Sequence, residues 1–181
     1  MTRSSTAGQG REAEYLEFAA GRTGDLYRSA CLLTGGDTHL AEDLVQETLS
    51  RMFVLWRRRT AWFAGAVRID NPAAYAHTVL VRIFLSHRRL RSSGERPVGE
   101  LPDGPGREGD PALSLTLIGA LAQLSARDRA VLVLRYWEDR SVEETADVLR
   151  SRSGAVRTQS VRALARLRVL LGDSLTELAQ R

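Results

Sequence analysis

Between residues 41 and 53 the sequence AEDLVQETLSRMF carries acidic and amide side chains at a spacing that an α-helix brings together. Asp43, Gln46, Glu47 and Ser50 follow an i, i+3, i+4, i+7 pattern and so share one face of the helix. Carboxylates form charge-assisted hydrogen bonds, and amides neutral ones, with basic side chains of another protein. Because an ordinary solvated face is mixed in sign, this face predicts a docking surface.

The acidic residues of this segment lack the companions of a metal or catalytic centre. Glu42, Asp43 and Glu47 have no Glu-x-x-His pair of the kind found in helical-bundle metal sites, and the three histidines are isolated. The sequence has no H-E-x-x-H motif, no glycine-rich phosphate loop and no G-x-S-x-G motif. An enzyme is therefore disfavoured, and we expect no catalytic residue, metal ion, cofactor or small-molecule substrate.

The segment SVEETADVLRSRSGAVRTQSVRALARLRVLL, residues 141–171, has the layout of a helix-turn-helix. A short helix ends near Arg150, a turn follows, and a longer helix begins near Ser153. Recognition helices read base edges near their N-terminus, where arginine pairs with guanine and threonine or serine contacts bases or phosphates. A three-helix domain that packs without DNA is the alternative. The candidate DNA-binding residues are Arg152, Ser153, Gly154, Arg157, Thr158 and Arg162.

The positive charge of the chain is concentrated in two segments. Residues 71–91 contain four arginines and residues 150–168 contain six, and neither segment contains an acid. Arginines that neutralise phosphates release counterions, which supplies affinity for nucleic acid. One such segment is compatible with a merely solvated helix. Two of them, each toward the C-terminal end of one helical half, favour nucleic-acid binding.

Composition limits the class of protein further. The chain has 181 residues, 43% of them hydrophobic, and its 26 basic residues, all arginine, exceed 22 acids for a net charge of +4. A folded core is expected, and the basic balance suits an anionic partner. Cys31 is the single cysteine, so no disulfide framework forms within the chain. No apolar run approaches the roughly 20 residues of a membrane span, and the first ten residues lack a signal-peptide core. We therefore expect a cytoplasmic protein without a membrane partner.

A proline- and glycine-rich stretch divides the chain into two helical halves. Residues 92–111 hold four of the five prolines and five glycines, a composition that no helix tolerates. No strand or hairpin pattern occurs on either side, which predicts an all-α fold of two small helical domains joined by a flexible linker. We expect a disordered tail (1–10), a first domain (11–91), the linker (92–111) and a second domain (112–181). The expected helices are 11–33, 38–58, 72–90, 112–123, 126–137, 141–149 and 153–171.

Residue types at the helix ends support these bounds. Short polar side chains that accept from free backbone N–H groups precede four of the expected helices. Ser141 and Glu144 match the S-x-x-E capping box, and Pro72 suits a first helical position. The expected N-caps are Asp37 or Thr38, Asn71, Ser125 and Ser141.

Three segments together carry a resemblance to a known family. HLAEDLVQETLSRMF, NPAAYAHTVLVRIFLSHRR and LSARDRAVLVLRYWEDRSVEETADVL, followed by VRALARLR, resemble bacterial RNA polymerase sigma factors. The likeness is to the extracytoplasmic-function (ECF) group of the sigma-70 family, in its SigE-like actinobacterial branch, and spans about 160 residues in the expected order. The resemblance implies a first domain that docks on polymerase and opens the promoter, and a second that reads the minus-35 element. The polymerase core does the chemistry.

The resemblance also assigns partners to the two kinds of candidate surface. The stripe of Asp43, Gln46, Glu47 and Ser50 would meet the clamp helices of the polymerase β′ subunit. Leu44 would face the domain core instead. The β subunit, promoter DNA and, as in many relatives, an anti-sigma protein would be further partners.

Residues 71–91 resemble the helix that engages the minus-10 element and captures an unpaired base. Such a binder needs positive charge and flat groups on which bases stack. The sequence departs from the family pattern, which tends to have Asn at Arg82 and Trp at the two positions of His87 and Arg88. The candidate minus-10 residues are Tyr75, Arg82, His87, Arg88 and Arg89, and Phe84, Trp62 and Phe63 are further aromatic candidates. Each of these aromatics is more often a core residue than a stacking platform, and we expect Phe84 to pack inward.

The turn of the helix-turn-helix departs from the family pattern as well. Relatives usually have Gly where Arg150 stands and a capping Ser where Arg152 stands. A non-glycine residue in a left-handed conformation costs roughly 1 kcal/mol. Either this turn has another shape or the protein accepts that strain, and Ser151 or Ser153 takes over the cap.

Two non-enzymatic alternatives remain open at the level of sequence. A helix-turn-helix repressor or activator would bind a palindrome tightly as a dimer, without polymerase. A degenerate relative would sequester promoters or polymerase without initiating transcription.

Overall fold

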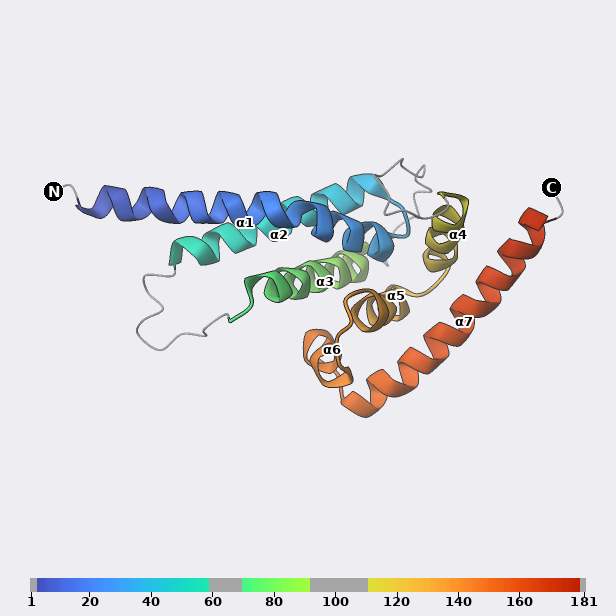
Figure 1. Ribbon diagram of the computed structural model, residues 1–181. Coiled ribbons are helices and arrows are strands. Elements are labelled where there is room, and N and C mark those ends of the chain that lie inside the picture. The colour runs from blue at the N-terminus through green and yellow to red at the C-terminus, as the bar shows by residue number, and fades with distance from the viewer. Residues whose placement is uncertain (1–2, 59–69, 92–110, 180–181) are drawn as a thin grey trace.

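The computed structural model describes residues 3–58, 70–91 and 111–179, and in these ranges the chain is helical with short turns and no strand (Figure 1). The all-α prediction is confirmed. The elements are α1 (Arg3–Thr34), α2 (Thr38–Arg58), α3 (Pro72–Arg91), α4 (Pro111–Ala122), α5 (Ala126–Leu132), the π-helical turn η2 (Val133–Trp137), α6 (Val142–Leu149) and α7 (Ser153–Ala179).

Three helix ends differ from the expected bounds by more than one or two residues. Helix α1 begins at Arg3, so the expectation of a disordered tail over residues 1–10 is wrong for residues 3–10. Extending an existing helix needs no new nucleus, which explains how a weakly helical sequence joins it. For the same reason α7 continues to Ala179 rather than ending at 171. The expected helix 126–137 changes at Val133 into the π-helical turn.

The capping residues lie where the sequence indicates. Asp37 rather than Thr38 caps α2, since its Oδ1 accepts from the Leu40 amide at 3.0 Å. Asn71 accepts from the amide of Ala74 at 3.0 Å. Ser125 accepts from Asp128, and Ser141 with Glu144 forms the complete capping box. Between α1 and α2, Gly35 and Gly36 both adopt positive φ, of 72° and 90°, which makes the turn possible.

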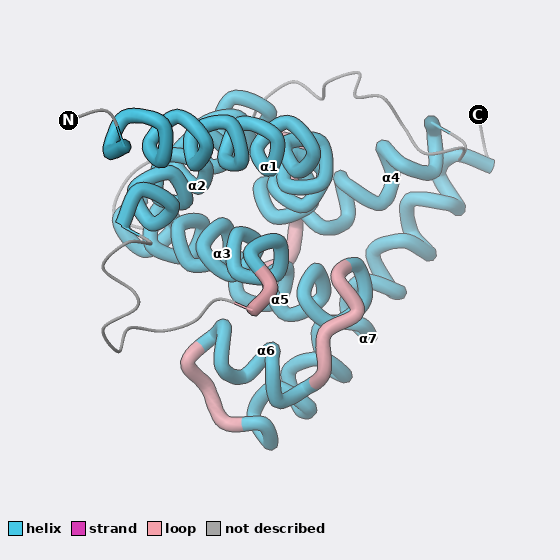
Figure 2. Tube along the Cα trace, turned by 60° about the vertical axis from the view of Figure 1, so that its left-hand side comes forward, coloured by secondary structure: helices cyan, strands magenta, loops and turns pink. Residues whose placement is uncertain are grey.

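Helices α1, α2 and α3 form the first half of the molecule. Helix α1 runs antiparallel to α2 (Figure 1), and α3 packs along both (Figure 2). Their contact faces bury Leu26, Leu44, Leu80 and Phe84 completely. Tyr15 of α1 also joins the two helices, because its hydroxyl donates to the carbonyl oxygen of Leu49 on α2 at 2.8 Å.

Helices α4 to α7 form the second half. Helix α7 packs on α4, α5 and α6, and its buried stripe contains Val156, Ala163 and Leu167. These residues recur at the helical period on the inner side, as their spacing predicts. Helices α6 and α7 with their turn make the helix-turn-helix.

The two halves pack directly on each other. One hydrophobic cluster contains Leu80 and Phe84 of α3 together with Val131, Leu134 and Val148 of the second half. Helix α3 contacts α5 and α6, and α1 contacts α4, α5 and η2. Two helical halves were expected, but their shared core was not. In the described part of the chain no helix is long and apolar enough to cross a membrane.

Candidate docking and nucleic-acid interfaces

The acidic stripe lies on the open side of α2. Asp43, Gln46 and Ser50 are exposed and Glu47 is partly exposed. On the opposite side of the helix, the side chains directed into the first half are completely or almost completely buried: Leu44, Thr48 and Met52. Thr48 satisfies its hydroxyl by donating to the Leu44 carbonyl oxygen at 2.7 Å. The helix is therefore anchored by one face and presents the other as a surface of carboxylates and an amide.

Glu47 connects the stripe to α3. Its Oε2 lies 3.1 Å from Nε2 of His87, and its Oε1 accepts from Arg51 at 2.6 Å. Partial burial works to raise the pKa of Glu47, but the bonds from His87 and Arg51 outweigh it and hold that pKa below its usual value. The Glu47 carboxylate is therefore an anion at neutral pH, pre-oriented at the edge of the stripe.

The candidate minus-10 residues do not all share one exposed surface. Arg89 is exposed, Arg88 is half-buried, and His87 is engaged with Glu47. Tyr75 packs in part against the core. The fifth candidate, Arg82, donates to the carbonyl oxygens of α6 residues in the other half of the molecule.

Among the further aromatic candidates, Phe84 packs inward as expected and is excluded as a stacking platform. It is completely buried, with the guanidinium of Arg129 5.7 Å from its ring centroid. Trp62 and Phe63 lie outside the described residues.

The candidate minus-35 residues gather on the first turns of α7 and just before it. Arg152, Gly154, Arg157, Thr158 and Arg162 are exposed and Ser153 is half-buried. Gly154 has open space on its outer side, where an added Cβ would have no neighbour within 4 Å. Arg157 makes one loose, exposed ion pair with Glu143, at 3.4 Å. These side chains are therefore available to a ligand on the outer face of the helix.

Asp128, which the sequence analysis did not single out, anchors helix α7. Asp128, 5% exposed, accepts from Gln159 at 3.0 Å through Oδ1 and from Arg166 at 2.8 Å through Oδ2. Both donors belong to α7, whereas Asp128 lies in the first turn of α5. The signal in the sequence was weak, because an acid in a first helical turn is common for its favourable interaction with the helix dipole alone.

We expect Asp128→Ala to loosen α7. The substitution removes two hydrogen bonds, and because Arg166 is largely exposed we expect a loss of only about 1–2 kcal/mol in the free energy of unfolding. Denaturant melts of the variant and of Asp147→Ala, an exposed acid on α6, would measure the difference. Equal stability of the two variants would contradict the anchoring role.

The turn between α6 and α7 has the strained left-handed backbone that was one of the two shapes expected from the sequence. Arg150 caps α6 in a left-handed conformation, at φ 49° and ψ 52°. The following amide, of Ser151, donates to the Ala146 carbonyl oxygen at 2.9 Å, which closes the turn in the usual way.

Arg150→Gly is expected to stabilise the protein. Glycine adopts this conformation without steric strain, so we expect a gain of about 1 kcal/mol in the free energy of unfolding, reduced by the greater freedom of the unfolded chain. Thermal melts would show a higher Tm than wild type, whereas Arg150→Ala would not. A lower Tm for the glycine variant would contradict the strain at this position.

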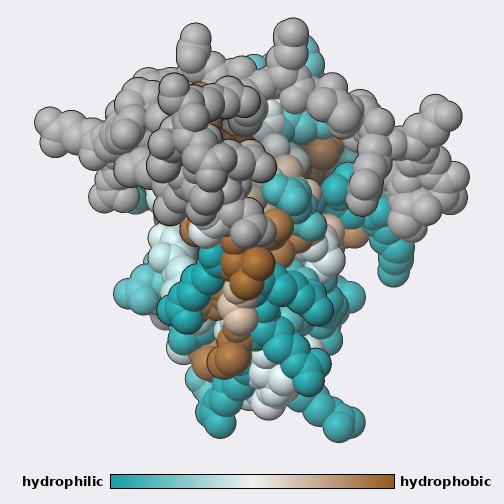
Figure 3. Space-filling model, turned by 90° about the vertical axis from the view of Figure 1, so that its right-hand side faces the viewer, coloured by the Kyte–Doolittle hydropathy of each residue, from teal (hydrophilic) through white to brown (hydrophobic). Residues whose placement is uncertain are grey.

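The outer side of the second half also carries apolar groups. Val161 and Val169 on α7 are 69% and 64% exposed, and Leu115 on α4 is 45% exposed. The face shown in Figure 3 displays a narrow apolar stripe bordered by hydrophilic side chains. A pattern of this kind is typical of a protein-binding surface beside a charged one.

Comparison with known proteins decides the family. The family model described as Sigma-70, region 4 matches residues 120–169. The RNA polymerase sigma-E factor of Streptomyces coelicolor is 34% identical over 164 residues, covering 88% of this chain and 86% of the relative. The chain belongs to the ECF group of RNA polymerase sigma factors.

Two further similarities agree with this assignment. The ECF RNA polymerase sigma factor SigL of Mycobacterium tuberculosis is 36% identical over 161 residues, covering 82% of this chain and 83% of the relative. Among solved structures, the sigma factor RpoE of Bartonella quintana, crystallised with the anti-sigma factor NepR, shares the fold with a TM-score of 0.69. That match has 25% identity and covers 88% of this chain and 97% of the RpoE chain.

The matched region 4 covers the helix-turn-helix. Residues 120–169 include α5, η2, α6 and most of α7, and so all six candidate minus-35 residues. As a sigma factor of this group, the protein directs RNA polymerase to promoters, and its region 4 binds the minus-35 element.

Proposed function

We propose that this sigma factor divides its work between the two halves of the chain. Residues 11–91 dock on polymerase and open the minus-10 element, residues 112–181 read the minus-35 duplex, and residues 92–111 connect them. The protein has no catalytic role of its own and acts in the cytoplasm, where polymerase and promoters lie. The arrangement of α2 carries this proposal most directly, because one face anchors the helix and the other presents exposed acids and an amide.

For core docking, we assign the α2 stripe of Asp43, Gln46, Glu47 and Ser50 to the β′ clamp helices. Basic side chains there would pair with the two carboxylates, while Gln46 and Ser50 offer neutral hydrogen bonds. The bonds from His87 and Arg51 orient Glu47 before docking, so that less conformational freedom is lost on binding. We assign the β subunit as a second contact, on the second half, whose exposed apolar residues suit a protein partner.

For promoter recognition, we divide the DNA contacts between α3 and α7. In α3, Tyr75, Arg82, His87, Arg88 and Arg89 supply charge and flat groups for the opened minus-10 strand. In α7, the exposed side chains at the helix start enter the major groove and the backbone N–H groups face phosphate. The minus-35 contacts are Arg152, Ser153, Gly154, Arg157, Thr158 and Arg162.

Run-off transcription with purified core polymerase tests the proposal. Genomic fragments are transcribed by core alone and by core with this protein, and we expect promoter-specific transcripts only in the second reaction. Absence of any specific transcript, with core that remains active together with another sigma factor, would favour a degenerate relative. Tight binding of the free chain to a palindrome would favour a repressor.

An anti-sigma factor is a further proposed partner. RpoE of Bartonella quintana, whose fold this chain shares over 88% of its length, was crystallised in complex with one. Such a protein would compete for the surfaces assigned here to polymerase or promoter.

A further inference from the structure

Glu143, in the first turn of α6, contacts the recognition helix. Its Oε1 accepts from Nη2 of Arg157 on α7 at 3.4 Å, across 14 positions of the chain. The two side chains are 65% and 69% exposed, so this ion pair contributes little to stability. Arg157 is one of the proposed minus-35 residues, and its guanidinium therefore lies between an acid of the same protein and the DNA that it is proposed to read.

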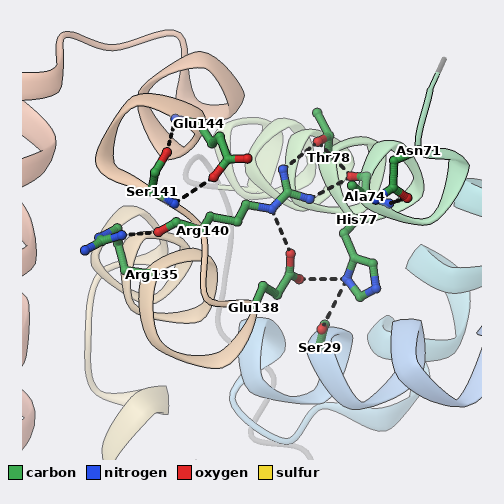
Figure 4. Close-up of polar contacts among 10 residues, drawn as sticks. All are labelled: Ser29, Asn71, Ala74, His77, Thr78, Arg135, Glu138, Arg140, Ser141 and Glu144. Atoms are coloured by element: carbon green, nitrogen blue, oxygen red, sulfur yellow. Dashed lines mark hydrogen bonds and ion pairs between the residues drawn. The ribbon is translucent and has the colours of Figure 1, made fainter.

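The backbone that carries Glu143 is held in place on both sides (Figure 4). The capping box fixes the start of α6, because Glu144 Oε2 accepts from the Ser141 amide at 2.7 Å and Ser141 Oγ accepts from the Glu144 amide at 3.0 Å. Just before it, Arg140 donates to the Ala74 carbonyl oxygen of α3 at 2.7 Å. Of the two acids in this first turn, Glu144 is committed to the cap and Glu143 is the one that reaches α7.

The backbone around Arg157 is anchored as well. Val156, directly before it, is completely buried, and Gln159, two positions after it, donates to the buried Asp128 at 3.0 Å. The side chain of Arg157 can move, but its point of attachment cannot. The approach of Glu143 and Arg157 is therefore a consequence of how α6 and α7 pack.

This pairing treats the two kinds of DNA group differently. A guanidinium has five N–H donors, and Glu143 uses one of them, so Arg157 can donate to O6 and N7 of guanine while it stays beside the carboxylate. Those guanine atoms are neutral acceptors. A phosphate is an anion, and to take Arg157 it must approach the Glu143 carboxylate or displace it, which like-charge repulsion opposes.

The other arginines near the start of α7 have no such companion. In the described ranges of the chain, neither Arg152 nor Arg162 forms an ion pair with an acid, and both are exposed. Helix α6 carries three acids and no basic residue over 142–149, whereas residues 150–168 carry six arginines and no acid. Glu143 is the acid of α6 that reaches across this boundary, and Arg157 is the arginine that it meets.

We propose that Glu143 is a positioning residue that makes minus-35 recognition selective, because it holds Arg157 for a guanine edge and keeps that arginine from phosphate. Arg152 and Arg162 supply the affinity for the DNA backbone that the pair withholds. The inference rests on the proposed assignment of Arg157 to the minus-35 element.

Glu143→Gln tests this role, since it keeps the shape of the side chain and removes its charge. Holoenzyme assembled from core and each sigma variant is bound to two labelled duplexes: a promoter found by run-off transcription, and the same promoter with its minus-35 element scrambled. We expect affinity for the scrambled duplex to rise about fivefold and affinity for the intact one to stay near wild type, so the ratio of the two falls about fivefold. On the scrambled duplex, the slope of log affinity against log salt should steepen by about one, because the released Arg157 contacts one more phosphate.

Two matched variants separate this role from a general effect of charge. Asp147→Asn removes one exposed negative charge from the same helix and should change affinity for both duplexes by the same factor, which leaves their ratio at the wild-type value. The double variant Arg157→Ala/Glu143→Gln should show the ratio of Arg157→Ala alone, because Glu143 acts through Arg157. Thermal melts by circular dichroism should coincide for all variants, since the pair is exposed.

The outcomes distinguish the inference from the function on which it rests. If Glu143→Gln keeps the wild-type ratio, or lowers it equally in the Arg157→Ala background, Glu143 does not position Arg157. If Arg157→Ala itself leaves the ratio unchanged, the assignment of Arg157 fails and the inference fails with it. A wild-type holoenzyme that binds both duplexes equally would refute the proposed minus-35 contacts as a whole.

Discussion

Asp43→Arg is expected to abolish retention of the sigma factor on immobilised core polymerase while leaving its fold intact. Asp43 is exposed at the start of the α2 stripe, and no part of the buried face of the helix depends on it. Reversing its charge sets an arginine against the basic side chains that we assign to the β′ clamp helices. Like charges brought together at an interface cost several kcal/mol, so we expect affinity to fall by about 100-fold or more.

A matched control distinguishes this contact from a general effect of charge. Glu17→Arg makes the same reversal at an exposed position on α1, away from the stripe. It should bind core as wild type does, and both variants should melt at the wild-type temperature. Normal retention of a folded Asp43→Arg variant would remove the α2 stripe from the docking surface.

Arg157→Ala is expected to reduce transcription from promoters with an intact minus-35 element by about 5- to 150-fold, which corresponds to the 1–3 kcal/mol of a good arginine–guanine contact. Its side chain is 69% exposed, and the loose ion pair with Glu143 contributes little to stability. The loss should therefore appear in promoter recognition and not in the melting curve.

Promoter variants supply the sharper test of this contact. Each single substitution in the minus-35 element is transcribed by wild type and by Arg157→Ala. At the base pair that Arg157 reads, the two proteins should discriminate differently, and elsewhere they should respond alike. Arg127→Ala, at an exposed position of α5, serves as the control for lost charge. A uniform loss across all sequences would instead assign Arg157 to phosphate.

Much of the local structure was predictable because its causes are local. Asn71 and Ser141 cap their helices through backbone groups three residues away, and Leu44 and Met52 are buried because the helical period places them opposite the acidic stripe. The stripe itself needed only the periodicity of one helix. The position of the recognition helix likewise followed from a turn and an apolar stripe within 31 residues.

Other residues were assigned incompletely because their partners are distant in sequence. Arg82 was predicted to contact DNA from its charge and its place in a basic helix, but nothing nearby indicated that its bonds lead to α6, 65 and 66 positions away. Asp128 was unassigned for the same reason, since its donors are 31 and 38 positions away. Arg129 looked like any other arginine of a basic chain, although it is 1% exposed and lies over the ring of Phe84 in the first half.

The sequence by itself determined an all-α chain in two halves, with an acidic stripe on one helix and a recognition helix near the C-terminus. Three of its segments also suggested the sigma factor family. Periodicity, capping and charge act over a few residues and can be read along the chain. Only the tertiary structure decided that the halves share one core and that Arg82 bonds to Val148, Glu138 contacts His77 and Arg140 donates to the Ala74 carbonyl oxygen across it. Such contacts depend on how two separately helical surfaces meet, and that geometry is set by the whole molecule rather than by any one segment.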